Sequence, residues 1–142
     1  MSPKLLAGTL AAIAGAIVGA IAWAAITAAT SYQIGYMALG VGFLAGLGMR
    51  TLSGGRERAD GVIAGVVAFL GCVLGNLGAV GVTIAQHEHY PIAVVLLALA
   101  RRPAFAVDAL RADFNIMDVL FYAIAVYAGY RTALKPPAAQ PA

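Results

Sequence analysis

Cysteine and charged residues are both scarce in this chain. One cysteine, Cys72, occurs among 142 residues, which excludes an intrachain disulfide and a thiolate metal cluster. Charged residues make up 11% of the chain, against about 25% in a typical soluble domain, and 62% of the residues are hydrophobic. A water-soluble domain of this length needs more polar side chains, because its surface faces water. The composition therefore predicts an integral membrane protein.

Motifs for catalysis and for nucleic-acid binding are also missing. The sequence contains no Gly-rich phosphate loop before a strand, no HExxH pair and no nucleophile elbow, so we expect no catalytic residue and no bound cofactor. The arginines lie singly or in pairs beside apolar runs and form no basic face. The net charge of +3 therefore does not indicate nucleic-acid binding, and the absences together favour a non-enzymatic protein.

Four long apolar runs predict an all-α bundle of transmembrane helices. Each run is close to or longer than the ~20 residues that a helix needs to cross a ~30 Å hydrocarbon core. A signal peptide could mimic the first run, but its apolar part would be only about 7–15 residues long. Residues 1–135 are therefore expected to form one transmembrane domain, followed by a disordered tail, 136–142. The predicted spans are residues 5–30, 34–52, 61–85 and 116–134.

The distribution of Lys and Arg predicts that both termini are cytoplasmic. With the N-terminus inside, six basic residues lie on the cytoplasmic side and three on the opposite side, in agreement with the positive-inside rule. The cytoplasmic set is Lys4, Arg50, Arg56, Arg58, Arg131 and Lys135, and the outer set is Arg101, Arg102 and Arg111. The sequence thus predicts a multi-pass protein of the cell membrane, with membrane lipid as its first partner.

The segment between the third and fourth spans is too short in its apolar part to cross a bilayer. Pro91 and Pro103 bracket a short helix at 92–102, which could lie in the membrane interface, cap the bundle or enter and return. We favour an interfacial or capping position, because backbone that is not helical needs shielding at depth. Residues 104–113 then predict a surface helix whose apolar face carries Val107, Leu110 and Phe114.

Small residues four positions apart are the clearest pattern inside the spans. Such faces allow helix backbones to approach closely in lipid. We expect most of them to pack within the chain, although a homo-oligomer or a partner membrane protein is the alternative. The predicted packing glycines are Gly15, Gly19, Gly42, Gly46, Gly61, Gly65, Gly71 and Gly75.

Few polar residues stand out as candidates for chemistry. His87, Glu88 and His89 are the only cluster that suggests a metal, but a defined site usually needs three or four ligands on one face, so we expect an ordinary loop. Asn76 lies well inside the third span and is expected to form a hydrogen bond between helices. Asp118 follows Asn115 by three residues, which favours helix capping over an intramembrane carboxylate.

Two stretches carry a family resemblance. One is Gly35-Tyr-Met-Ala-Leu-Gly-Val-Gly-Phe-Leu-Ala-Gly46, and the other is Asp118-Val-Leu-Phe-Tyr-Ala-Ile-Ala-Val-Tyr-Ala-Gly-Tyr-Arg131. Together they resemble uncharacterised small bacterial multipass proteins of the inner membrane, in which Gly-rich middle helices precede a last helix that ends in an aromatic–basic pair. The resemblance implies a four-helix membrane layout and carries no activity or ligand.

Two classes of function are compatible with these features. An accessory or scaffold subunit would pack its small-residue helix faces against partner membrane helices. A small channel or transporter would require several copies around a pore, because a bundle packed on glycine and alanine leaves little room for a path. The spans have no charge near their centres, which favours the accessory role.

Overall fold

The computed structural model describes residues 2–31 and 35–134, and this part of the chain is all-α. Its six helices account for 88% of the described residues, and no strand occurs among them. The predicted tail 136–142, Lys135 and the start of the second predicted span at residue 34 lie outside the described residues. The helices are α1 (Pro3–Thr30), α2 (Met37–Ser53), α3 (Arg58–Glu88), α4 (Ile92–Arg101), α5 (Pro103–Asp113) and α6 (Ile116–Ala133).

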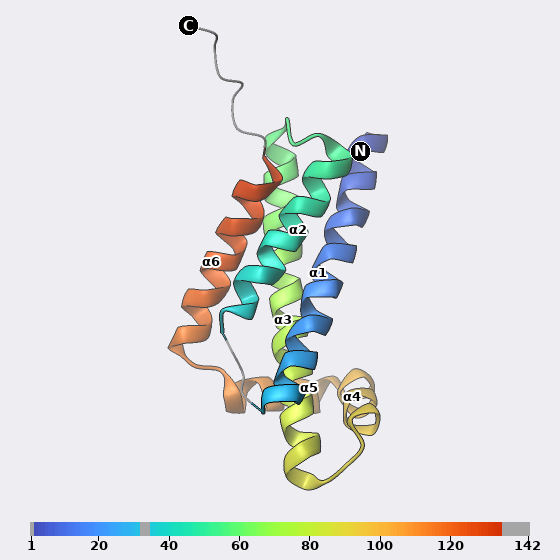
Figure 1. The fold of residues 1–142 in the computed structure, drawn as a ribbon, viewed down its shortest axis with the longest axis vertical. Helices are drawn as coiled ribbons and strands as arrows, with labels where there is room; N and C mark the ends of the chain where they lie inside the picture. Colours follow the sequence, from blue (N-terminus) through green and yellow to red (C-terminus); the bar gives the residue numbers. More distant parts are fainter. Residues whose placement is uncertain (1, 32–34, 135–142) are drawn as a thin grey trace, which may run out of the picture.

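Four of the helices, α1, α2, α3 and α6, form an antiparallel bundle (Figure 1). Helices α2 and α3 contact each other, and each also contacts both α1 and α6. Helices α1 and α6 therefore lie at opposite edges of the bundle. The start of α1, the end of α2, the start of α3 and the end of α6 share one end of the molecule, and we call it the N-terminal end (Figure 1).

Small side chains fill the core of the bundle. Most of its fully buried members are alanines, and the larger ones are few, such as Val41, Met49 and Trp23. Because alanine and glycine keep side-chain bulk low, the helix axes approach closely and backbone contacts backbone. The core therefore depends on van der Waals contact between helices.

The eight predicted packing glycines all lie at contacts within the chain. On α1, Gly15 and Gly19 face α2, and on α2, Gly42 and Gly46 face α6. A methyl group on Gly15 would collide with the backbone carbonyl of Leu44. On α3, the first two glycines face α6 and the last two face α1 and α2; these are Gly61, Gly65, Gly71 and Gly75.

The helix ends follow the local sequence. Ser2 caps α1, with its Oγ accepting a hydrogen bond from the Leu5 amide at 3.2 Å, and Pro3 occupies the first turn. Helix α2 ends at Gly54, whose φ of +93° is in the left-handed region that favours glycine. At the start of α6, the predicted N-cap Asn115 accepts a hydrogen bond from the Met117 amide at 2.8 Å.

Helices α4 and α5 pack beside the far part of α3, beyond the other three bundle helices (Figure 1). Val95 and Leu99 of α4 are buried there, against a second small core that includes Ala85. The structure has a helix, α5, at the position predicted for the surface helix. Ala106 of α5 is buried, whereas Val107 and Phe114 of the predicted apolar face are 49% and 41% exposed and lie on the outside of the molecule.

Two of the described helices, α1 and α3, are long and apolar enough to cross a membrane. Helix α2 is apolar but has 17 residues, and α6 has 18 residues with Asp118 and Arg131 near its ends. The predicted all-α fold is confirmed, and each of the four predicted spans contains one helix within the described residues. The length and composition of α1 and α3 therefore support membrane association.

Candidate functional site

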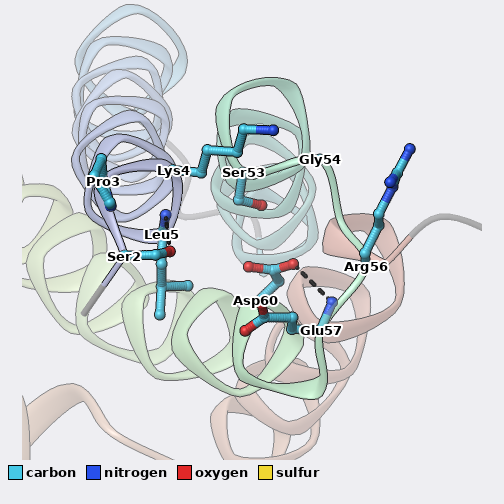
Figure 2. Close-up of a pocket in the computed structure, with 9 residues that line it drawn as sticks. All are labelled: Ser2, Pro3, Lys4, Leu5, Ser53, Gly54, Arg56, Glu57 and Asp60. Atoms are coloured by element: carbon cyan, nitrogen blue, oxygen red, sulfur yellow. Dashed lines mark hydrogen bonds between the residues drawn. The ribbon is translucent and has the colours of Figure 1, made fainter.

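A cavity with several polar side chains lies at the N-terminal end of the bundle, where the ends of α1, α2 and α3 meet (Figure 2). Its volume is about 610 Å³. Residues of α1 form one wall, and the turn from α2 to α3 forms the other. The lining residues are Ser2, Pro3, Lys4, Leu5, Ser53, Gly54, Arg56, Glu57 and Asp60.

Asp60 is the buried charged residue of this cavity, with 3% of its surface exposed. Its Oδ2 accepts a hydrogen bond from the Glu57 amide at 3.1 Å, and the Glu57 side chain accepts one from the Asp60 amide. This reciprocal pair is a capping box at the start of α3. Asp60 therefore holds the turn against the helix and presents its carboxylate toward the cavity (Figure 2).

The two hydroxyl groups of the cavity are both engaged with backbone amides. Ser2 Oγ accepts from Leu5, and Ser53 Oγ accepts from Gly55 at 3.2 Å. No histidine lines the cavity, so no base of the usual kind stands beside either serine. The arrangement can bind a polar group, with Lys4 in its lining.

Removing the Asp60 carboxylate is expected to weaken the start of α3. Asp60→Ala should lower the free energy of unfolding by about 1 kcal/mol, because the amide of the N-cap residue Glu57 loses its acceptor. Denaturant titration in mixed micelles would measure the change. Asp108→Ala, at an exposed position of α5, is the matched control and should change stability by less than about 0.5 kcal/mol. Equal effects of the two variants would contradict the capping role.

A buried polar network crosses the bundle from α3 to α6. Asn76 donates from Nδ2 to the Tyr122 hydroxyl at 3.1 Å, and that hydroxyl donates to the Cys72 carbonyl at 3.1 Å. Cys72 Sγ lies 3.7 Å from the Ala38 carbonyl of α2. The structure thus gives Asn76 the interhelical hydrogen bond expected of it, and it adds Tyr122, which no sequence pattern singled out.

The histidine cluster lies at the exposed end of α3. His87, Glu88 and His89 are all exposed, and His89 ends the helix with a φ of 57°. No group of three or more His, Cys, Asp or Glu close enough to hold a metal ion occurs in the described part of the chain. The neighbouring Gln86 has a structural role, because its Nε2 donates to the Ala28 carbonyl at 2.9 Å and ties α3 to the end of α1.

Asp118 serves as the second half of a capping box at the start of α6. Its Oδ2 accepts a hydrogen bond from the Asn115 amide at 2.9 Å. Burial, and then the nearby Asp118 carboxylate, raise the pKa of Asp113 above its ordinary value. The two carboxylates therefore lie near one another at the junction of α5 and α6, away from the polar cavity.

Besides Tyr122, sequence reasoning missed three residues with structural roles. Asp60 lies next to a charged turn and resembles an ordinary surface residue in the sequence. Trp23 is buried with its indole N–H unpaired among the described residues, and it packs on Gly75. Gly129 lies against the Ala64 carbonyl. The spacing of Glu57 and Asp60 was a detectable signal for a helix start. The roles of Trp23 and Gly129 depend on which helices are neighbours, and the sequence does not give this.

Comparisons with protein-family models, with curated proteins and with solved structures found no match to this chain. The resemblance to small bacterial multipass proteins therefore stays a prediction.

Proposed function

We propose that this chain is a four-span protein of the bacterial cell membrane, and that it acts as a non-enzymatic accessory or scaffold subunit. The observation that supports it is the outer surface of the bundle. Large apolar side chains are exposed on all four bundle helices, including α2 and α6. Water-soluble monomers rarely expose contiguous apolar surface of this extent, whereas lipid is a suitable solvent for it. Examples are Leu10 and Ile17 of α1, Phe43 of α2, Leu70 of α3 and Leu120 of α6.

The ends of the bundle support the proposed orientation. The N-terminal end carries Lys4, Arg56, Arg58 and Arg131, while Arg101 and Arg111 belong to α4 and α5 at the other end (Figure 1). This asymmetry agrees with cytoplasmic termini. Helix α2, at ~1.5 Å per residue, is about 26 Å long, so local thinning of the bilayer or its flanking Tyr36 would complete the span.

The interior of the bundle favours a binding role over transport. Closely packed small residues, mainly alanines, fill the interior, and the amide of Asn76 is hydrogen-bonded to Tyr122 of the same chain. A pore between copies would need a polar stripe on an outer face. The exposed side chains between residues 6 and 29 of α1 and between 62 and 74 of α3 are all apolar. Since the glycine faces are turned inward, we propose that partner helices contact the aliphatic outer face of α1.

Topology is tested with reporter fusions. A reporter after Ala142 should be active on the cytoplasmic side, and one inserted beside Asp108 should be active on the opposite side. A third fusion at Gly54, in the turn between α2 and α3, is the internal control and should match the Ala142 fusion. Reporters at Ala142 and Asp108 on the same side would contradict four spans.

The accessory role is tested by native mass spectrometry after gentle extraction at natural expression level. A stoichiometric complex with a different membrane protein is the expected result. A discrete homo-oligomer without another protein would instead favour the channel, and flux assays would follow. A bare monomer would contradict both.

A further inference from the structure

An open apolar groove runs along the outside of the bundle between α3 and α6. It has a volume of about 590 Å³, and its lining is almost entirely apolar. Gly61 and Gly65 lower its floor on the α3 side. The lining residues are Gly61, Val62, Gly65, Val66, Phe69, Ala123, Val126, Tyr127 and Tyr130.

The groove continues into a second cavity further along the same two helices. This cavity, of about 430 Å³, shares Phe69, Ala123 and Val126 with the first and extends it toward Val119. From Tyr130 to Val119, α6 rises by about 17 Å at ~1.5 Å per residue. One leaflet is about half of a ~30 Å hydrocarbon core. The combined groove therefore matches the depth that one acyl chain of a phospholipid spans.

Two arginines stand at the N-terminal mouth of the groove. Arg58 precedes Gly61 by three residues and shares the groove face of α3, while Arg131 follows Tyr127 by four on the exposed face of α6, at the edge of the groove. The two helices meet at this level, because a methyl group on Gly61 would lie 2.8 Å from the Tyr130 ring. Both arginines are exposed, and neither has an ion pair within the described part of the chain.

We propose that this groove binds an anionic phospholipid of the cytoplasmic leaflet. One acyl chain fills the channel from Tyr130 to Val119, and the phosphate is held by Arg58 and Arg131. Guanidinium groups bind phosphate oxygens with two parallel hydrogen bonds, and tyrosines favour the headgroup level. The inference rests on the proposed membrane insertion, and it adds a lipid class and a binding site to it. A partner helix would fill the apolar part but would leave both arginines without an anion.

The test compares retained lipids in native mass spectra of the full chain. The probes are phosphatidylglycerol and phosphatidylcholine with identical acyl chains, added in equal amounts. Arg58→Gln combined with Arg131→Gln should lower the ratio of bound phosphatidylglycerol to phosphatidylcholine about tenfold or more, since each basic residue contributes about 1 kcal/mol near anionic lipid. The matched control, Arg101→Gln with Arg111→Gln at the other end, should leave the ratio within about twofold. An equal fall in both pairs would overturn the site.

The acyl-chain contact is tested separately with Ala123→Phe, which fills the groove at an exposed position. Retention of both lipids should fall several-fold, whereas Ala14→Phe, at an exposed position on α1, should leave it unchanged. Unchanged retention in Ala123→Phe would overturn the groove as the chain site. Another outcome is that a different protein co-purifies in place of lipid with the wild-type chain and is absent with Ala123→Phe. That result would also overturn the lipid site, because it would mean that a helix of a partner protein occupies the groove. A wild-type chain that stays in the aqueous phase without detergent would instead refute the proposed membrane insertion.

Discussion

Gly42→Ala is expected to lower the free energy of unfolding by about 2–3 kcal/mol. Gly42 lies at the contact between α2 and α6, and a methyl group there would fall on the Ala125 carbonyl and 3.0 Å from the Ala125 Cα. These are backbone atoms of a helix, so they cannot rotate away as a flexible side chain would. The two helices must separate to admit one carbon, and the small-residue core of the bundle loses contact along both.

Gly40→Ala is the matched control for this prediction. Gly40 lies two residues away on the same helix and is exposed, and a methyl group added there would have nothing within 4 Å. Alanine should be neutral there or stabilise the helix by up to about 1 kcal/mol, because glycine is the poorer helix former. Denaturant titration in mixed micelles measures both variants. A Gly42→Ala variant as stable as Gly40→Ala would contradict the close approach of α2 and α6.

Helix positions were predictable from the sequence because they depend on local properties. The apolar runs, Asn115 before the last span and the prolines around residues 92–102 each mark an element by composition or capping. The glycine pattern also predicted that helices would approach closely. Which helix each glycine faces was not predictable. A repeat of four residues shows that the glycines lie on one face of their helix, but it does not identify the helix that packs against this face. Gly42 facing α6 and Gly19 facing α2 therefore required the structure.

The candidate sites were less predictable than the fold. Asn76 was identifiable as a polar residue in an apolar run, but its partner Tyr122 is 46 residues away and lies among other tyrosines of α6. The polar cavity joins residues from the first turn of α1 and from the α2–α3 turn, and no sequence spacing relates these segments. The α3–α6 groove likewise exists only where two outer faces meet.

Tyr122→Phe is expected to lower the free energy of unfolding by about 1–2 kcal/mol. The hydroxyl accepts from Asn76 Nδ2 and donates to the Cys72 carbonyl, and all three groups lie in the buried interior. Phenylalanine keeps the ring, which packs edge-on against Phe69 and Phe114, so little volume is lost. The Asn76 amide is then left without its partner, and an unsatisfied buried polar group costs about 1–3 kcal/mol, somewhat less between helices in lipid.

A double-mutant cycle separates this hydrogen bond from packing. Asn76→Leu removes the stranded amide, so adding Tyr122→Phe to it should cost less than Tyr122→Phe alone, by about 1 kcal/mol. Tyr127→Phe, on the exposed side of α6, is the matched control and should stay within about 0.5 kcal/mol of wild type. Additive costs in the cycle would mean that Asn76 and Tyr122 do not stabilise each other. The coupling would show that the buried Asn76–Tyr122 hydrogen bond stabilises the contact between α3 and α6.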